Sequence, residues 1–319
     1  MANAYTSTDS GSLGNYLVQA AYDRYVEFAL RAVPLIRDVA DKRPVQQAMP
    51  GSSVVFQLYN DLSKATGTLS ETADPDAVGF GNTNQVSVTL NEYGNAALAT
   101  RKLELFSLSD VDPAIADIIA FNMADSIDEV AQTVLRGGSN VIYSANSTGT
   151  VPTSTTGIGT TNTIKSADIR KAVAKLRTNK AVPRQGEFYW CGIHPEVSHD
   201  LRAETGAGGW REAHVYNESG AGELWPGSIG TYEGAMFVES PRLYNGTDGA
   251  SSTRVFRTIL AGKQALAEAI AEEPHVVVGP VVDKLMRFRP IGWYGVLGFA
   301  RYREASLYRI ESTSSIDNA

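Results

Sequence analysis

Histidines are the side chains of this sequence best suited to metal binding or to acid–base chemistry near neutral pH. The chain has four of them, at His194, His199, His214 and His275. His194 and His199 are five positions apart, so on a helix their side chains would point in directions roughly 140° apart rather than share one face. His194 also directly precedes a proline, at the predicted start of a short helix over 194–201. We therefore favour a capping or surface role for this pair over a metal site.

Two pairs of aspartates could ligate a cation such as calcium, because the members of each pair are two residues apart. They are Asp74 with Asp76 and Asp110 with Asp112. Pro75 lies within the first pair and Pro113 follows the second, which is typical of a turn and of the first position of a helix. We expect turn and capping roles rather than a calcium site.

Arginines that could contact phosphate cluster near the carboxyl end of the chain. The cluster consists of Arg287, Arg289, Arg301 and Arg303. Acidic residues are close to them in sequence, at Asp283, Glu304 and Glu311. We therefore favour salt bridges between neighbouring strands over phosphate binding.

The single cysteine, Cys191, lies in the apolar run 188–193, which predicts a buried strand. A buried free cysteine usually behaves as a small apolar side chain rather than as a nucleophile. The sequence also contains no phosphate-binding glycine loop, no dinucleotide fingerprint, no Gly-x-Ser-x-Gly turn and no paired cysteines for zinc. We expect no catalytic residue, no cofactor and no metal.

The chain of 319 residues has 28 lysines and arginines against 35 aspartates and glutamates, a formal net charge of −7. Such an acidic chain does not attract polyanions through general charge. No run of about 18 apolar residues could cross a membrane. The first residues lack the basic stretch and apolar run of a secretion signal. We expect a soluble chain, without membrane contact, that is long enough for two domains.

The elements are organised around one long helix, predicted for 112–136. Asp112 with Pro113 supplies the start signal, and Gly137 with Gly138 supplies the stop. Between them apolar residues recur every three or four positions and form one face, while polar residues such as Asp128 and Gln132 are expected off that face. A helix of about 36 Å needs strands from elsewhere to pack along its length. We expect a spine rather than one helix of a bundle.

Two strands are predicted at 53–59 and 85–91 from their β-branched residues and their alternation. A long connection rich in Asn, Asp, Ser, Thr and Gly separates them, whereas hairpin loops usually have two to five residues. A two-stranded ribbon is marginally stable alone in water. The segment is therefore either disordered or a protruding finger that contact with a neighbouring molecule orders.

Apolar residues at helical spacing also occur in 17–39, interleaved with charged residues and interrupted by Pro34. A proline in this position kinks or divides a helix. The segment is either a helix packed on its own domain or an arm laid across a neighbouring subunit, and the sequence favours neither.

The remainder alternates helices and strands. The expected elements are helices at 166–179, 194–201 and 264–272 and strands at 188–193, 235–238, 254–261, 275–278, 284–288, 293–300 and 305–310. The alternation across 165–245 predicts a mixed α/β domain. We expect the closing strands to pack on the spine helix, so that the mixed domain is inserted into the domain of that helix.

This order of parts resembles the tailed-bacteriophage major capsid proteins of the Hong Kong 97 (HK97) fold. The similarity is strongest in 53–62 (SVVFQLYNDL), 89–95 (TLNEYGN), 100–102 (TRK) and 112–125 (DPAIADIIAFNMAD). These segments are similar to the capsid proteins of actinobacterial phages, within the group related to the coat protein of the N4-like viruses. None of them is a catalytic motif, so the resemblance depends on similarity that extends over nearly the whole chain.

The resemblance implies an α+β fold with a discontinuous main body. Its parts are an N-terminal arm (1–51), an extended β-hairpin finger (52–100), a peripheral domain with the spine helix (101–160 and 251–319) and an inserted axial α/β domain (161–250). In that family the finger and the arm reach over neighbouring subunits, and the axial domain points to the centre of each pentamer or hexamer. The candidates for contact between subunits are Tyr25, Phe28, Leu62, Lys64, Phe80 and Arg101.

The resemblance also implies a function. Copies of the chain would form the icosahedral head shell of a tailed phage, assembled in the bacterial cytoplasm, around double-stranded DNA that is bound without sequence specificity. Scaffolding, portal and decoration proteins are candidate partners. No helical scaffolding segment precedes the arm, so we expect either a separate scaffold or a different assembly route. Some relatives cross-link a finger lysine. Lys64 is the only lysine in this finger, but no motif marks its partners, so we do not expect a cross-link.

Two alternatives belong to other functional classes. An encapsulin-like nanocompartment would share the fold and would be indicated by a partner enzyme with a docking peptide rather than by enclosed DNA. A soluble metal-dependent enzyme would need a convergent set of titratable groups, and the sequence supplies none.

Overall fold

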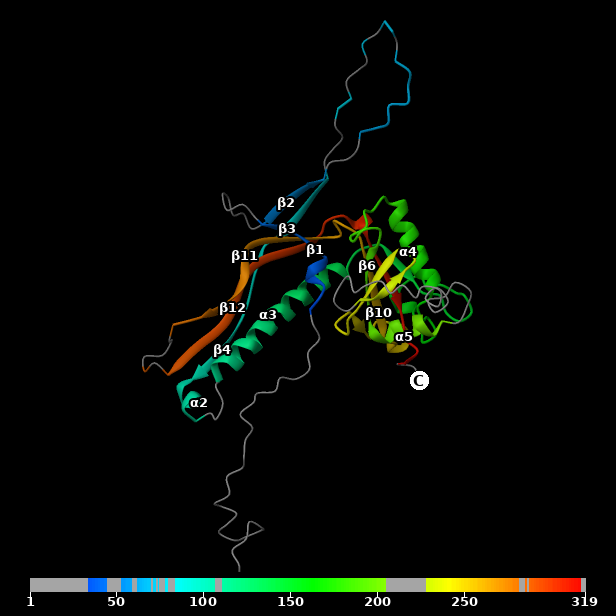
Figure 1. The fold of residues 1–319 in the computed structure, drawn as a ribbon. Coiled ribbons are helices and arrows are strands. Elements are labelled where there is room, and N and C mark those ends of the chain that lie inside the picture. Colours follow the sequence, from blue (N-terminus) through cyan, green and yellow to red (C-terminus); the bar gives the residue numbers. More distant parts are fainter. Residues whose placement is uncertain are drawn as a thin grey trace, which may run out of the picture.

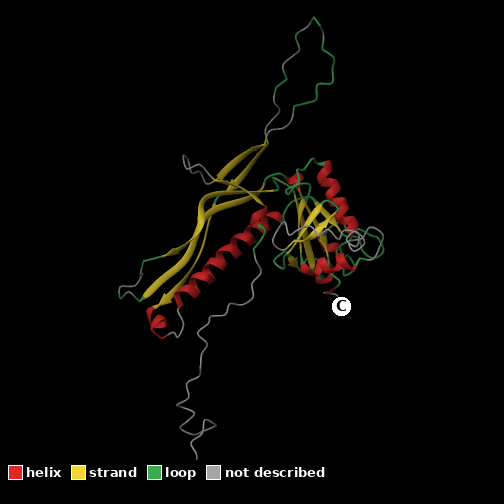
Figure 2. Cartoon of the chain, viewed as in Figure 1, coloured by secondary structure: helices red, strands yellow, loops and turns green. Residues whose placement is uncertain are grey.

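A computed structural model describes residues 34–44, 53–58, 62–69, 71–72, 74, 78–79, 84–106, 111–204, 228–280, 285 and 287–316. The described chain forms two units that meet near the carboxyl end of one long helix, and a thin projection rises from the first unit (Figure 1). Strands dominate the first unit, whereas helices and strands mix in the second (Figure 2).

The long helix is α3 (Val111–Leu135), which we call the spine helix. The predicted span of 112–136 is confirmed to within one residue at each end. Because the helix begins at Val111, Asp112 is its second residue rather than the predicted cap, and Pro113 is its third residue rather than its first. The stop is found where it was expected: Gly138 has a φ of +97°, a conformation that glycine adopts without the steric cost of a Cβ. A short helix, α2 (Arg101–Phe106), precedes the spine helix.

A four-stranded sheet, which we call the spine sheet, packs along the spine helix. Its order is β1 (Ala40–Pro44), β11 (Leu266–Val278), β12 (Phe288–Arg301) and β4 (Asn91–Thr100). β1 is parallel to β11, and the other pairs are antiparallel. Ile119 and Ile127 of the helix pack against the buried side chains of Trp293 and Leu297, and the indole N–H of Trp293 donates to Asn122 Oδ1 at 3.0 Å. The sheet thus holds the helix along its length, as the spine interpretation requires.

The predicted ribbon consists of β2 (Ser53–Leu58) and β3 (Asn84–Thr89), paired antiparallel. Its base packs on the spine sheet through Phe56 and Val88, and the Phe56 ring meets Tyr302 edge-on at 5.7 Å between centroids. The chain that follows the ribbon, β4, pairs with β12 along its whole length. Residues 91–100, expected to belong to the finger, therefore lie in the spine sheet.

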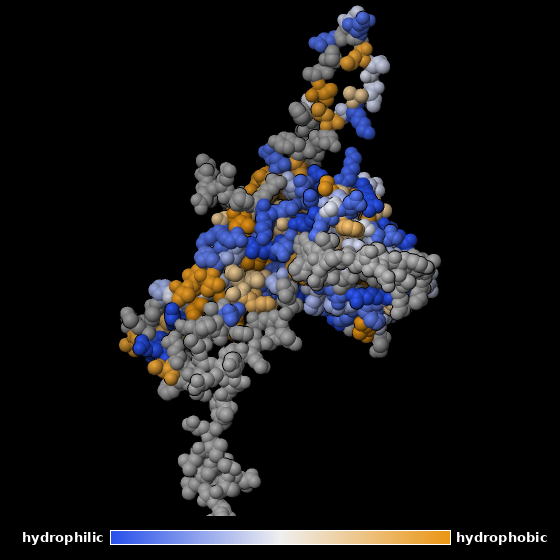
Figure 3. Space-filling model, viewed as in Figure 1, coloured by the Kyte–Doolittle hydropathy of each residue, from blue (hydrophilic) through white to orange (hydrophobic). Residues whose placement is uncertain are grey.

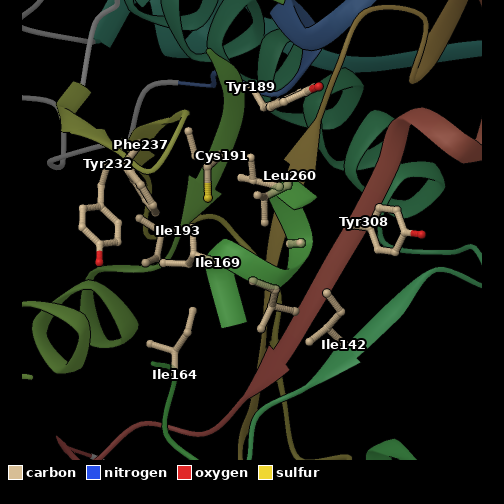
Figure 4. Close-up of a cluster of buried hydrophobic side chains, with 14 of the residues drawn as sticks. Ile142, Ile164, Ile169, Tyr189, Cys191, Ile193, Tyr232, Phe237, Leu260 and Tyr308 are labelled. Carbon is tan, nitrogen blue, oxygen red and sulfur yellow. The ribbon is translucent and has the colours of Figure 1, made fainter. Parts of the chain in front are cut away.

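The second unit is built on a seven-stranded mixed sheet, the second sheet. Its strands are β5 (Val141–Tyr143), β13 (Leu307–Ser312), β10 (Val255–Ala261), β6 (Tyr189–Ile193), β8 (Ala235–Glu239) and β7 (Ser228–Tyr232) in that order, with β9 (Asn245–Gly246) paired to β10. The helices are α4 (Ser166–Thr178) and α5 (Pro195–Ala203), with 3-10 turns η2 (Thr155–Gly157), η3 (Ala250–Ser252) and η4 (Glu304–Ser306). Ile169 of α4, Leu260 of β10 and Phe237 of β8 meet in its core (Figure 4).

The two units are joined at three places by the chain and by a shared core. The chain crosses between them at 136–140, 262–265 and 302–306, where the spine helix leads to β5, β10 to β11, and β12 to β13. The shared core contains Leu135 of the spine helix, Trp190 of β6 and Leu266 of β11. We call this region the joint.

The helix predicted for 264–272 is wrong, because this segment lies in the strand β11. Its alanines and glutamates favour a helix by intrinsic propensity, but the segment pairs with β1 on one side and β12 on the other. Tertiary pairing of this kind overrides local propensity.

The closing strands do not all pack on the spine helix. β10 and β13 pair with each other, and β10 also pairs with β6, so both belong to the second sheet. The apolar residues of β10 and β13 predicted strands correctly. Apolar content alone does not show which strand each of them pairs with. In addition, β12 is one strand of 14 residues that includes the predicted strand at 293–300.

Candidate interaction surfaces

The histidines lie apart in the described part of the chain. His194 caps α5, with its ring Nδ1 accepting the N–H of Glu196 at 3.3 Å, which confirms the capping prediction. His199 is exposed on the same helix, and His275 is exposed on β11. His214 lies outside the described residues. Among the residues that the structure describes, no group of three or more His, Cys, Asp or Glu side chains could hold a metal ion.

One salt bridge of the predicted set, between Arg301 and Glu304, is present in the described residues, whereas Glu311 pairs with arginines outside the predicted four. Arg301 Nε and Glu304 Oε2 are 3.0 Å apart. Glu311 is fully buried and pairs with two other arginines, Arg309 at 2.8 Å and Arg257 at 3.2 Å. Thr155 donates its hydroxyl to the same carboxylate at 2.6 Å.

Two arginines donate to carbonyl oxygens at the carboxyl end of the spine helix, Arg309 from the second sheet and Arg301 from the spine sheet. Arg309 donates to the carbonyl oxygens of Arg136 at 2.5 Å and Gly138 at 3.1 Å. Arg301 donates to the carbonyl oxygen of Val134 at 3.1 Å. The last carbonyls of a helix have no partner within the helix, and cations are favourable there. The contacts therefore fix the end of the spine helix in the joint.

Cys191 is completely buried in the core of the second unit, as predicted, and its sulfur is surrounded by apolar side chains (Figure 4). Burial raises the pKa of the thiol well above its ordinary value. A thiol that stays protonated is a poor nucleophile. The residue is part of the packing.

The projection above the ribbon exposes every residue that the structure describes in it, over 62–69, 71–72, 74 and 78–79. Apolar side chains are among them: Leu69 is 78% exposed and Val78 is 67% exposed. Figure 3 shows these apolar side chains on the projection and further ones over the first unit. None of the described residues of the projection is buried within the subunit, which favours contact with another molecule.

Three of the six candidate contact residues lie in the described part of the chain. Leu62, 49% exposed, and Lys64 are in the projection. Arg101 is exposed at the start of α2, at the opposite end of the first unit, where its backbone N–H donates to the carbonyl of Arg287 at 2.9 Å. Tyr25, Phe28 and Phe80 lie outside the described residues. The structure thus places Leu62 and Lys64 together and Arg101 far from them.

A second surface is an open groove of about 600 Å³ across β4, β11 and β12. Its lining includes Val277, Tyr294 and Gly292. A Cβ on Gly292 would come within 2.8 Å of the carbonyl oxygen of Asn95, so no larger residue fits there without movement. The adjoining end of β11 exposes three successive valines, Val276–Val278.

The spine helix also carries buried polar side chains that its sequence pattern did not predict. Asp128 and Gln132 are only 1% and 2% exposed. Gln132 donates to the carbonyl oxygen of Arg242 at 2.6 Å, and Asp128 accepts backbone N–H groups from the chain before β1. Their spacing of four residues, next to Ile127 and Ala131 on the apolar face, is the signal that could have identified them.

Comparisons with known proteins identify the fold. A family model for phage capsid proteins matches residues 15–316. The capsid of Ralstonia phage GP4 is similar over 98% of both chains, with 16% identity and a TM-score of 0.72. The head structure of the Helicobacter pylori bacteriophage KHP40 covers 97% of this chain and 99% of its own, with 13% identity and a TM-score of 0.71. Mycobacterium phage Che8 covers 92% and 96%, with 15% identity and a TM-score of 0.61. No curated protein matches the sequence.

Two further observations bear on the class of protein. In the described residues no helix has the length and apolar character that a bilayer crossing requires. The family match covers both units and the ribbon, so it does not depend on one segment. The chain therefore belongs to the phage capsid protein family, and it is a major capsid protein with an HK97-like fold.

Proposed function

We propose that copies of this chain assemble as pentamers and hexamers into the icosahedral head shell of a tailed bacteriophage, which encloses double-stranded DNA. The observation that carries this proposal is the projection, in which every described residue is exposed while its base is anchored on the spine sheet. An anchored element that exposes leucine and valine side chains suits contact with a neighbouring copy. The shell would then be stabilised by many repeated contacts between identical chains.

We further propose that the arm and the projection make contacts between subunits through Tyr25, Phe28, Leu62, Lys64 and Phe80, and that Arg101 makes a separate contact from the start of α2. The spine helix and the spine sheet would form the shell wall, and the second unit, predicted as 161–250, would face the centre of each pentamer or hexamer. The pairing of β10 and β13 with β6 supports a second unit that also contains these two strands.

The chemistry of the chain suits a container rather than a catalyst. The net charge of −7 would limit adhesion of packaged DNA to the wall, since binding to the phosphate backbone depends on basic side chains. We propose that the chain has no enzymatic activity of its own, that assembly takes place in the bacterial cytoplasm, and that scaffolding, portal and decoration proteins join the shell.

Electron microscopy of the purified protein tests the proposal directly. Closed shells are the expected result, and a small oligomer of uniform size would contradict it. Deletion of residues 62–82 should leave a folded subunit, judged by circular dichroism, that does not form stable shells. Normal particles from the deleted chain would show that the projection is not an assembly element. Nuclease-protected DNA in particles from infected cells separates a phage head from an enzyme-loaded compartment.

A further inference from the structure

Residues 34–44, where the described part of the chain begins, are held at the joint. Ile36 and Val39 are buried in the shared core, with 1% and 0% exposure. The chain then makes the 3-10 turn η1 (Arg37–Val39) and enters the spine sheet as β1, parallel to β11. The joint therefore fixes the point at which the described chain begins.

Asp128 makes the polar contact at that point. Its Oδ1 accepts two backbone N–H groups, from Ile36 at 2.7 Å and from Arg37 at 3.0 Å. The first N–H groups of a helical turn have no partner within it, and a side chain at the preceding residue usually supplies one. Ile36 has no side-chain acceptor, so the carboxylate of the spine helix serves instead, from 92 positions along the chain.

Side chains from both units hold the other sides of this segment. The Arg37 guanidinium is 2.7 Å from the fully buried carboxylate of Glu268 on β11. Arg184, from the second unit, donates to the carbonyl oxygen of Asp38 at 2.8 Å. Asp41 accepts the backbone N–H of Gln264 at 2.7 Å. These contacts constrain both the position of residues 34–44 and the direction in which the chain runs through them.

We propose that Asp128 is the positioning residue that fixes Ile36 and Arg37 at the joint, and that shell assembly depends on Asp128 through the N-terminal segment of which they are part. This inference rests on the proposed function. The role requires the acceptor oxygen rather than the negative charge, because both N–H groups meet the same Oδ1. Burial raises the pKa of the Asp128 carboxyl, against the opposing effect of these two N–H groups and of Arg242, so the site does not favour the charge itself.

Three variants of the full chain separate the acceptor from the charge. Asp128→Ala removes the acceptor, and Asp128→Asn keeps Oδ1 without the charge. Asp125→Asn is the matched control, because Asp125 is on the same helix and pairs with the same Arg242. Hydrogen exchange of the Ile36 and Arg37 amides in the unassembled subunit reports the contact directly. Shell yield, measured by sedimentation and microscopy, reports the function.

In Asp128→Ala we expect the two amides to exchange on the order of 10-fold faster or more, because two hydrogen bonds are lost. Shell yield should fall by a similar factor at temperatures well below the unfolding transition. Asp128→Asn and Asp125→Asn each remove the charge of an ion pair with Arg242, so both should lose stability to unfolding. Both should keep the slow amide exchange and the shell yield of the wild type when measured well below the unfolding transition. Fast exchange with normal shell yield, or a loss of shells in Asp125→Asn equal to that in Asp128→Ala, would overturn the proposal.

Phe28→Ala, alone and combined with Asp128→Ala, tests whether Asp128 acts through the arm. If it does, the double variant should lose less than the product of the two separate losses. If the shell yield of the double variant equals the product of the two single-variant yields, the claim that Asp128 acts through the arm is wrong. If Asp128→Ala does not fold, Asp128→Asn decides the matter, because a folded Asn variant without shells contradicts the acceptor role. If the wild type forms no shell, the proposed function fails, and the exchange rates alone then decide whether Asp128 positions the segment.

Discussion

Replacing Arg309 by methionine should strongly destabilise the subunit, because the guanidinium serves the end of the spine helix and a buried carboxylate at once. The Arg309 side chain is 15% exposed, and its partner Glu311 is fully buried. Methionine retains much of the apolar stem and removes the charge. Breaking a buried ion pair by removing one partner costs about 3–5 kcal/mol. Arg257 still faces Glu311 at 3.2 Å, which places the expected loss toward the lower end of that range.

Arg301→Met is the matched control, because Arg301 also donates to a carbonyl of the same helix end. Arg301 and its partner Glu304 are 36% and 37% exposed, so this change should cost only about 0–1 kcal/mol. With a slope of about 3 kcal/mol per molar urea, a loss of about 3 kcal/mol lowers the unfolding midpoint by about 1 M, against at most about 0.3 M for the control. The measurement is urea unfolding of the unassembled subunit, followed by circular dichroism. Equal shifts for the two variants would refute the argument from burial.

Three further predictions concern the ribbon, the thiol and a helix cap. Phe56→Ala should remove about 3–5 kcal/mol from the anchoring of the ribbon and speed proteolysis within 53–89, whereas the exposed Leu69→Ala should change stability by less than about 0.5 kcal/mol; similar proteolysis in both would contradict this. The pKa of Cys191 is raised by burial, so above about pH 8.5 only the unfolded thiol ionises, and the free energy of unfolding should fall by about 1.4 kcal/mol per pH unit more than in Cys191→Ala; parallel pH profiles would refute it. His194→Ala should cost about 1 kcal/mol in thermal unfolding while His194→Asn retains the cap, and equal losses would count against the capping role.

Local signals in the sequence were sufficient to predict an element where the residues of one segment determine its structure. The spine helix is an example, because its start, its apolar spacing and its terminal glycines all lie within 111–138. The capping role of His194 was predictable for the same reason, since the proline and the glutamate that define the turn follow it directly.

Features that depend on distant partners were not predictable. β11 was taken for a helix because its alanines favour one, and only pairing with β1 and β12 makes it a strand. The contact of Asp128 with Ile36 joins positions 92 residues apart, and neither residue type indicates it alone. The candidate contact residues Leu62 and Lys64 were chosen from the length and polarity of the ribbon connection, and their exposure follows from the projection, whereas partners in another copy remain a prediction.

The threefold crossing of the backbone at the joint has a mechanical consequence. A body attached by one strand of chain can swivel about it, and a body attached by two can still pivot about the line between them. Three attachments that do not lie on one line prevent both rotations, and the chain has three, at 136–140, 262–265 and 302–306. A load on the ribbon, whose base is packed on β11 and Tyr302, would therefore reach the second sheet through covalent bonds as well as through side-chain packing. The two units of a subunit can then transmit tension from one to the other without rotating apart, a property that suits a shell under internal pressure.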